Sequence, residues 1–490
     1  MANAITDYEW VETNSPVASS RTDDIWFFDP HTGWLVNSNG QIAVTLDGGQ
    51  NWEIKHRVTS GAYLRCIGFT PSRARGWVGA IVGQDASDPD AYLQQLLRVT
   101  LDGGETWRTV ANLPKGSPGG ICGLSVVNEK VAYGSGSNDP NDVGPGIVKT
   151  VDGGQSWELI DMRDYASNLI DIHFFDEQRG WVVGGLANEA CQGPPPPSYN
   201  GHPQYYKVTP VALYTEDGGK TWENRVASLA FPCGEWGWKI DFLGGGDQIG
   251  FISLENFVEG AILKTLDGGK TWARLSVNDR RPLKFGQEVS NANLEGIGFI
   301  DESFGWVGGW GDRNFIGTYN SVTDDGGLTW KAEDYAVNAS SQPVGDVRLN
   351  VNRYRFFGDP VNVGYCSGKK VYKLVVKGAA EAPAVTSLVA APEAASQQEQ
   401  LAVSDGTTAT GHVTLDFQVP EGTQRLRVRL FNQFGFHIRS LVDETDPEAG
   451  SRSIEWDGLD AAGRPCVGPG AVICRVTTDD HAESRTFQLP

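Results

Sequence analysis

The sequence predicts an all-β protein, a seven-bladed β-propeller followed by a small β-sandwich, on the basis of three observations. The segment "TLDGGQNWE" at Thr45 recurs five more times with small changes, always carrying Asp, two Gly and Trp. Its copies are spaced by 50 to 65 residues, which is typical of propellers and solenoids. Four short strand patterns lie within each period, and turn-forming Gly is abundant at 61 residues.

The strand patterns follow one order around each copy of this segment, which we call the box. An apolar strand comes first, such as "LRCIGF" from Leu64, and a strand that begins with Gly-Trp comes second, such as "GWVGA" from Gly76. The third strand runs into the box, as in "LLRVTLDGG" from Leu96, and the fourth begins at the box Trp. The box therefore joins the third and fourth strands of a blade.

The box residues suit a tight turn better than a ligand site. An Asp in a turn accepts hydrogen bonds from nearby backbone N–H groups, Gly adopts positive φ, and Trp can be buried between blades. A calcium site needs several oxygens from one loop, whereas each box places one carboxylate reliably. We therefore interpret the box acids as structural and predict no metal site; they are Asp47, Asp102, Asp152, Asp217, Asp267 and Asp325.

The two ends of the repeat region predict how the propeller closes. After the last box only three strand patterns remain, from Tyr354, Asn362 and Lys369. The N-terminal "YEWVET" matches the strand that follows a box, and Trp10 precedes Phe27 by the same 17 residues that separate Trp52 from Phe69. The N-terminal strand is thus expected to complete a seventh blade, which would leave no free sheet edge.

Composition divides the chain into three parts. Residues 1–378 hold the repeats, residues 379–411 are rich in Ala, Pro, Ser and Gln and are expected to be a linker, and residues 412–490 resume strand-like alternation. The last part predicts an Ig-like β-sandwich.

Two resemblances carry functional expectations. The box resembles the Asp-box, or bacterial neuraminidase (BNR) repeat, and "FFDEQRGWVVGG" from Phe174 is similar to the photosystem II stability/assembly factor family of seven-bladed propellers. The tail segment "EWDGLDAAGRPCVGPG" from Glu455 resembles the Ig-like domain of flagellar hook-capping proteins, although "GAVICRV" from Gly470 departs from it. These resemblances imply a bacterial, non-catalytic binding or assembly protein that holds a protein or peptide partner.

Charge and cysteine content exclude several classes. A formal charge of −21 disfavours nucleic acid and anionic membrane as partners, and no apolar run suits membrane insertion. The start lacks a secretory signal, which favours the cytoplasm, whereas the tail resemblance favours an extracytoplasmic site. The seven cysteines contain no CxxC and predict neither a disulfide framework nor zinc; only Cys466 and Cys474 are close enough in sequence to suggest a bridge. No cofactor is expected.

Candidate binding residues lie in the long loops opposite the boxes, because variable loops on a rigid scaffold often carry function. The largest insertion, residues 186–210, combines a Pro run with tyrosines, and other loops offer a possible aromatic platform and a possible basic rim. A stiff lid, core tryptophans and single solvated charges are the alternative interpretations. The candidates are Tyr205, Tyr206, Trp236, Trp238, Trp310, Arg280, Arg281, Arg313 and Arg353. Acidic loops at 85–90 and 139–142 lack the spacing of a calcium loop.

No catalytic residue is predicted, since the chain shows no metal-spaced His pair, GxSxG motif or phosphate loop. Asp24, Asp171, Asp241 and Glu295 on the innermost strands nevertheless leave a carbohydrate-active hydrolase or lyase open, by analogy with sialidase and xyloglucanase propellers. A structural subunit that self-associates through its tail is the third possibility.

Overall fold

The computed structural model describes most of the chain between Tyr8 and Gln488. The described residues are 8–58, 63–82, 92–137, 144–191, 205–256, 258–279, 281–282, 288–289, 291–311, 320–333, 336–337, 350–358, 361–376, 401–403, 413–432, 437–459, 471–478 and 482–488. They are almost entirely β-strand, joined by turns and four short helices, which confirms the all-β prediction. The helices are α1 (Leu93–Leu96), η1 (Glu189–Cys191), η2 (Tyr205–Lys207) and η3 (Leu243–Gly245).

Four repeats form separate antiparallel sheets whose strands follow one another in chain order. The sheets are β2 (Thr22–Phe27), β3 (Gly33–Asn37), β4 (Gln41–Thr45) and β5 (Glu53–Arg57); β14 (Asn168–Phe174), β15 (Gly180–Ala187), β16 (Val208–Thr215) and β17 (Glu223–Asn224); β18 (Glu235–Phe242), β19 (Gly250–Asn256), β20 (Gly260–Thr265) and β21 (Ala273–Val277); and β24 (Leu294–Phe299), β25 (Gly305–Gly309), β26 (Asn320–Thr323) and β27 (Lys331–Glu333). A short hairpin, β22 (Arg281–Pro282) and β23 (Glu288–Val289), lies between the last two in sequence.

A fifth blade sheet joins the two ends of the repeat region. Its strand order is β28 (Ala336–Val337), β1 (Tyr8–Glu12), β31 (Val371–Val376), β30 (Val361–Ser367) and β29 (Arg353–Gly358). Trp10 of β1 lies opposite Leu374 of β31 in an antiparallel pairing. The N-terminal strand therefore pairs with the last propeller strands as expected.

The remaining two repeats do not form separate blades. Strands β6 (Tyr63–Phe69), β7 (Gly76–Ile81), β8 (Leu97–Thr100), β9 (Arg108–Thr109), β10 (Gly120–Val126), β11 (Ala132–Ser137), β12 (Gly146–Thr150) and β13 (Glu158–Asp161) belong to one eight-stranded sheet. The junction is a pairing of Gly120 with Ile81.

The predicted number of seven blades is therefore wrong: the sheet topology shows a pattern of five separate blades beside one joined sheet. Two glycines explain why the two repeats join into one sheet, because they have no side chain at the point of contact. A Cβ at Gly79 would lie 2.7 Å from the Ile121 carbonyl oxygen, and one at Gly120 would lie 2.7 Å from the Ile81 side chain. Glycine at both positions lets the backbones of β7 and β10 approach each other.

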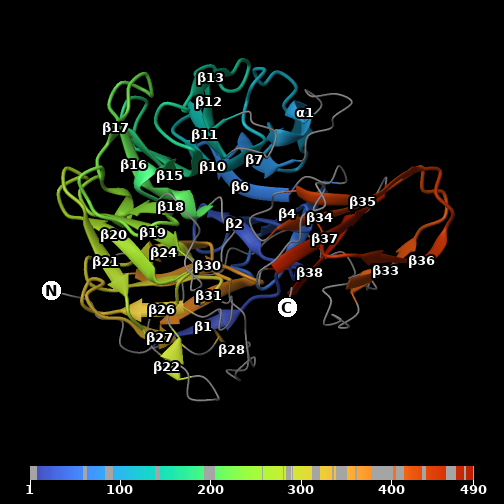
Figure 1. Ribbon diagram of the computed structural model, residues 1–490. Coiled ribbons are helices and arrows are strands. Elements are labelled where there is room, and N and C mark those ends of the chain that lie inside the picture. The colour runs from blue at the N-terminus through green and yellow to red at the C-terminus, as the bar shows by residue number, and fades with distance from the viewer. Residues whose placement is uncertain are drawn as a thin grey trace.

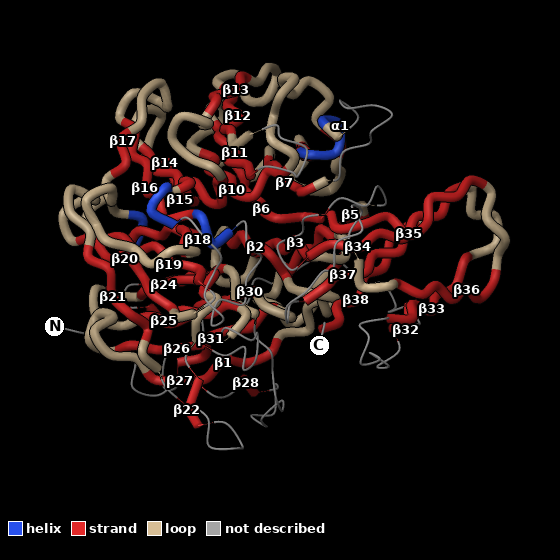
Figure 2. Tube along the Cα trace, in the orientation of Figure 1, coloured by secondary structure: helices blue, strands red, loops and turns tan. Residues whose placement is uncertain are grey.

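The first strands of the repeats lie at the centre of the propeller (Figure 1). Contacts link β2, β6, β10, β14, β18, β24 and β29 in this order, and β29 returns to β2. Strands such as β13, β17 and β21 lie at the periphery, and the strand-rich character of the whole is clear in Figure 2. No helix among the described residues is long and apolar enough to span a membrane.

The box hairpins are held by one hydrogen-bond pattern. In the first box, Thr45 Oγ1 donates to Asp47 Oδ1 (2.9 Å) and accepts from Gly49 N–H (2.8 Å), and Asn51 N–H donates to Asp47 Oδ1 (2.8 Å). The Asn51 side chain donates to the second oxygen, Asp47 Oδ2, at 2.7 Å. The other five boxes repeat the pattern with Thr or Ser in place of Asn51. Each Asp therefore accepts hydrogen bonds within its own hairpin.

The tail consists of two small sheets around one core. Strands β32 (Leu401–Val403), β33 (Val413–Val419) and β36 (Gly450–Trp456) form one sheet; β35 (His437–Thr445), β34 (Arg425–Asn432), β37 (Ala471–Thr477) and β38 (Ala482–Gln488) form the other. Buried Leu415, Leu430 and Trp456 belong to their shared core. Strand β32 falls inside the predicted linker and pairs with β33.

The prediction of an Ig-like domain is not supported, and the tail is described only as two packed sheets of three and four strands. In a constant-type immunoglobulin sandwich the fourth strand joins the sheet of the first two. Here β35 stays beside β34 in the four-stranded sheet instead, because the two strands pair along their length from Arg425 and Thr445 to Phe431 and His437.

Candidate functional site

The candidate site lies where the first strands of the repeats begin, on the side of the propeller opposite the boxes. We call this side the loop face, because the connections between second and third strands and between successive sheets emerge there. The box face carries the box hairpins and the turns between first and second strands; Gly103 N–H of one box, for example, bonds to the Ala74 carbonyl of such a turn.

A β-bulge recurs near the start of the first strands. The register of β2 against β3 shifts between Thr22 and Asp24, and similar shifts occur in β6, β10, β14, β18 and β24. A bulge leaves one residue outside the ladder and redirects its side chain. The residues within the shifts are Asp23, Arg65, Cys122, Ile170, Trp238, Lys239 and Glu295.

Several of these bulge residues meet in one buried group, which we call the central cluster: Arg21, Asp23, Arg65, Trp238, Glu295 and Asn352. Asp23 Oδ1 accepts from Arg21 Nε at 2.8 Å and pairs with an Arg65 guanidinium nitrogen at 2.9 Å. Arg21 also pairs with Glu295. These charged side chains are at most 1% exposed, so their mutual pairing offsets part of the cost of removing them from water.

Trp238 joins the charged groups to the last repeat. Its indole Nε1 donates to Asn352 Oδ1 at 2.9 Å, and the Asn352 amide donates to the Asp23 carbonyl. The guanidinium carbons of Arg21 and Arg65 lie 5.7 Å and 5.6 Å from the Trp238 ring, within the range of cation–π attraction. The central cluster thus draws on repeats from both ends of the propeller.

A second buried group, the Arg353 clamp, lies next to the first. Arg353 Nε pairs with Asp24 Oδ1 at 3.0 Å, and its two terminal nitrogens bond both oxygens of Asp171 at 2.9 Å and 3.1 Å. Lys239 Nζ lies 3.7 Å from Asp171. Burial alone would raise the pKa of Asp171, but the charges of Arg353 and Lys239 overcome it and lower the pKa to about 2.

The buried carboxylates near the centre therefore differ in their ion pairing and in the direction of their pKa shifts. Asp24 and Asp171 are held by Arg353, and Glu295 pairs with Arg21. Burial raises the pKa of Asp241 to about 6, against the opposing charges of Arg355 and Arg353. Burial likewise raises the pKa of Glu255 well above its usual range, although Arg21 and Arg65 oppose the shift. Ion pairing is the main chemistry of this set, and the described residues contain no group of metal ligands.

The structure places the predicted binding residues in different environments. Trp236, Trp238 and Trp310 are only 1–2% exposed, so they lie in the interior and not on an open platform. The Trp310 ring lies 5.3 Å from the Arg21 guanidinium carbon, beside the central cluster. Arg353 is buried in its clamp, which separates it from any exposed basic rim.

The other predicted residues are only partly covered by the description. Tyr205 begins η2, Tyr206 is half-buried, and the backbone of Arg281 lies in β22. Arg280 and Arg313 lie outside the described residues, as do the acidic loops at 85–90 and 139–142. The structure therefore does not show these residues gathering into one site.

Sequence reasoning missed Arg21, Asp23 and Arg65, because it searched the long loops. A signal was present: charged residues stand within apolar first-strand patterns, in "SRTDDIWFF" and "LRCIGF". Charged residues are almost never fully buried unless they are paired, so charged residues at these positions indicate a group of buried ion pairs.

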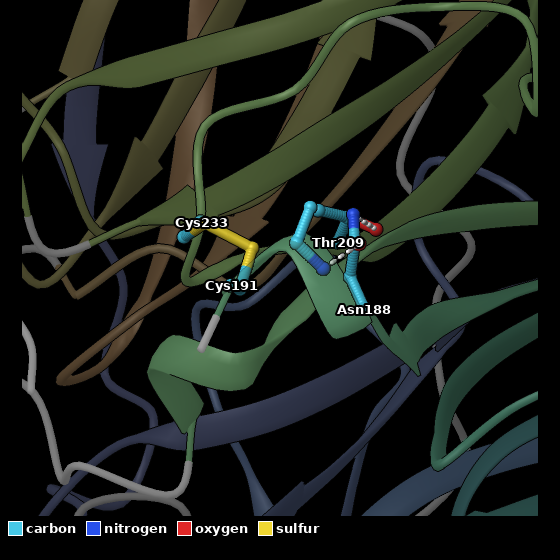
Figure 3. Close-up of a disulfide and its surroundings, with 5 residues drawn as sticks. Asn188, Cys191, Thr209 and Cys233 are labelled. Carbon is cyan, nitrogen blue, oxygen red and sulfur yellow. Dashed lines mark hydrogen bonds between the residues drawn. A yellow bond between two sulfur atoms is a disulfide. The ribbon is translucent and has the colours of Figure 1, made fainter. Parts of the chain in front are cut away.

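Sequence reasoning also missed a disulfide between Cys191 and Cys233, whose Cα atoms are 5.6 Å apart (Figure 3). Cys191 lies in the 186–210 insertion and Cys233 in the connection before β18, both on the loop face. The suggested partner of Cys466, Cys474, is a buried free thiol, and Cys466 lies outside the described residues. The two bonded cysteines are far apart in sequence, so spacing gave no sign of the pair.

Comparisons with known proteins find sequence similarity to one group, the Ycf48 assembly proteins. Residues 2–138, less than a third of the chain, match the family described as "Photosynthesis system II assembly factor YCF48". The chain is 25% identical over 280 residues to the photosystem II assembly lipoprotein Ycf48 of Synechococcus sp. (strain CC9902), covering 54% of this chain and 77% of that protein. It is 32% identical over 157 residues to photosystem II assembly protein Ycf48 of Thermosynechococcus vestitus (strain NIES-2133 / IAM M-273 / BP-1), covering 30% and 38%.

Solved structures give weaker similarities. A structure of YCF48 bound to D1 peptide matches with a TM-score of 0.48 and 18% identity, covering 76% of this chain and 97% of that one. YCF48 from Cyanidioschyzon merolae also matches with a TM-score of 0.48 and 18% identity, covering 75% and 99%. An ancestral GH74 enzyme matches with a TM-score of 0.48 and 11% identity, covering 99% and 64%. The chain is thus similar in sequence to Ycf48 assembly proteins over about half of its length.

Proposed function

We propose that this protein is a non-catalytic assembly factor of the Ycf48 type, whose propeller holds a protein or peptide partner on the loop face. The observation that carries the proposal is the 25% identity over 280 residues to a photosystem II assembly lipoprotein. The family match within residues 2–138 supports the same assignment. Because a Ycf48 structure has been solved with a D1 peptide, a peptide of that type is the natural probe.

The central cluster and the Arg353 clamp support a binding role. General acid–base catalysis needs a titrating group within reach of the substrate. Asp24, Asp171 and Glu295 are instead 0–2% exposed and engaged with arginines. Such pairs hold the first strands in fixed positions, and a rigid centre favours binding through the loops that surround it.

Exposed aliphatic side chains give a direct test of which face binds. Val17 (54% exposed) precedes β2 and Val258 (41%) precedes β20, so both lie on the loop face. Leu101 (47%) and Leu266 (61%) are matched residues in box hairpins on the box face. Changing each pair to Asp alters charge and hydropathy equally on the two faces.

The measurement is the affinity of the full chain for a fluorescent D1-type peptide by anisotropy. We expect V17D/V258D to weaken binding at least about tenfold, a cost of about 1.4 kcal/mol, since a buried charge in a contact is costly. The L101D/L266D variant should bind like the unchanged protein. Equal affinities for all three proteins, or a loss confined to L101D/L266D, would contradict the assignment of the loop face. Absence of binding by the unchanged protein would contradict the peptide-binding role.

A further inference from the structure

The disulfide joins two segments of the loop face that no strand pairing among the described residues connects. Cys191 is the last residue of η1, where the 186–210 insertion begins, and Cys233 lies in the connection between β17 and β18, 42 residues later. Figure 3 shows the sulfur–sulfur bond next to Asn188 and Thr209, whose side chains are hydrogen-bonded to each other at 3.3 Å. The bond therefore lies where the insertion leaves β15 and returns to β16.

Backbone hydrogen bonds bring the same segments together. Asn188 N–H donates to the Lys207 carbonyl at 2.8 Å, and Cys191 N–H donates to the Asn188 carbonyl at 2.9 Å. Gly234 N–H donates to the Val208 carbonyl at 2.9 Å. Besides this last bond, the disulfide is a second, covalent link between the insertion and the start of β18.

The start of β18 leads directly to the central cluster. Glu235 follows Gly234 and makes a bidentate pair with Arg274 at 2.9 Å and 2.7 Å. Trp238 lies three residues further on, in the bulge, and donates to Asn352. Any loosening of Cys233 therefore acts on the segment that carries Trp238 into the cluster.

The remaining described cysteines cannot respond in the same way. Cys66, Cys122, Cys366 and Cys474 are buried and are not part of a disulfide, whereas Cys233 is half-buried. Burial also raises the pKa of the Cys66 and Cys366 thiols well above the usual range, which disfavours the reactive thiolate form. Among these residues the redox chemistry is concentrated at the 191–233 pair.

We propose that the Cys191–Cys233 disulfide is a redox-sensitive tether: while intact it fixes the start of β18 and Trp238, and its reduction weakens partner binding at the loop face. The claim about binding rests on the proposed function, whereas the claim about β18 does not. The proposal also assigns the working form of the propeller to an oxidising compartment, where such bonds persist.

The reaction that releases the tether is thiol–disulfide exchange with a dithiol. A dithiol thiolate attacks Cys233 Sγ, a mixed disulfide forms, and the Cys191 sulfur leaves as a thiolate. The second dithiol sulfur then attacks the mixed disulfide and releases Cys233. Two electrons pass from the dithiol, which becomes a cyclic disulfide, and each protein thiolate takes up one proton.

Hydrogen–deuterium exchange of the full chain tests the tether. We expect dithiothreitol to speed exchange of the amides of residues 234–238 about tenfold, because local opening there becomes easier. The box hairpin at 100–107 is the internal control and should not change. The C191S/C233S variant should show fast exchange without reductant and no response to it, and Cys474→Ser should respond like the unchanged protein.

Each result has a separate meaning. Unchanged exchange at residues 234–238 after the bond has been reduced overturns the tether, and this comparison on the unchanged sequence stands even if C191S/C233S fails to fold. Faster exchange together with equal peptide affinity in both redox states overturns the control of binding. Faster exchange in a protein that binds no D1-type peptide in either state supports the tether and overturns the proposed function instead.

Discussion

The second glycine of one box, Gly104, lies directly against the indole ring of Trp34 from the preceding sheet. A Cβ at Gly104 would approach the Trp34 ring to 2.2 Å, and the φ of Gly104 is +95°. Trp181 and Gly269 repeat the relationship at the same distance. Trp34 also packs edge to face on the box Trp107, with ring centroids 6.1 Å apart. The box therefore packs against the Gly-Trp strand of the preceding sheet, and it also closes its own hairpin.

The two box glycines should differ in their tolerance of a side chain. Gly103 also has positive φ, but a Cβ there would meet only the Arg73 carbonyl, at 3.6 Å. Gly103→Ala should cost about 1 kcal/mol from the left-handed backbone alone. Gly104→Ala should cost about 1–3 kcal/mol more, since it also overpacks Trp34. Calorimetric melting of both variants compares them, and equal melting temperatures would contradict this account.

Closure by the N-terminal strand predicts a large effect of Trp10. The centroid of its indole ring lies 5.5 Å from that of Trp306 and 5.9 Å from that of Tyr354, between two neighbouring sheets. Trp10→Ala should destabilise the propeller by about 3–5 kcal/mol, as for other buried aromatic residues. Deleting residues 1–14 should lower the melting temperature further, whereas deleting only residues 1–7 keeps β1 and is the control. A melting curve unaffected by the longer deletion would disprove closure.

The box acids predict an acid-sensitive fold. Hydrogen bonds from Thr106 and Thr100 lower the pKa of Asp102 to about 2, and the pKa of Asp152 and Asp217 is likewise about 2. Because these folded-state values lie below the ordinary value of 3.8, their stabilisation is complete above that pH and is lost as pH falls towards 2.

Melting temperature measured between pH 5 and pH 2 checks this expectation. The unchanged protein should lose stability steeply over this window. Asp102→Asn should start lower, because the Asn amide nitrogen cannot accept from Thr106, and should show a shallower decline. A slope identical to that of the unchanged protein would show that Asp102 does not contribute to the titration.

The Arg353 clamp predicts a charge-dependent loss of stability. Arg353→Leu leaves Asp24 and Asp171 buried without their main partner, and should cost about 3–5 kcal/mol. The pKa of Asp171 should then rise above its ordinary value, so that the variant becomes less stable as pH increases through that range. Asp171→Asn added to Arg353→Leu should restore part of the loss.

Arg355→Leu is the matched control for the clamp. The Arg355 guanidinium is partly exposed and lies 3.9 Å from Asp24, farther than the 3.0 Å of Arg353, so its removal should have a smaller effect than that of Arg353. Urea-induced unfolding monitored by tryptophan fluorescence compares the variants. If Arg353→Leu and Arg355→Leu were equally stable, the clamp would have no special role.

The sequence predicted those features that depend on local chemistry. The box turn is local, because the Thr45 and Asp47 side chains bond within the same hairpin. The closing strand was visible because Trp10 repeats the position of Trp52 relative to the next first strand. The all-β class and the pairing of the N-terminal strand were thus accessible from pattern alone.

Features that depend on three-dimensional register were not accessible. The joining of two repeats depends on how closely Gly79 and Gly120 let their backbones approach. The central cluster depends on bulges that place Asp23 and Arg65 outside the ladder. Charged residues within apolar strand patterns indicate that these side chains are paired in the interior, but they do not show which strands supply the partners. The disulfide depends on two loops that meet only after both sheets have formed.

The recurring bulges also bear on how such a propeller can diversify. A residue outside the ladder has no fixed cross-strand partner on the sheet, so different repeats can carry different side chains there. The structure already shows the range that one position accepts: an acid at Asp23, a base at Arg65, a thiol at Cys122 and an aliphatic chain at Ile170. The chemistry at the centre of the molecule therefore differs from repeat to repeat, although the backbone irregularity that presents it is the same.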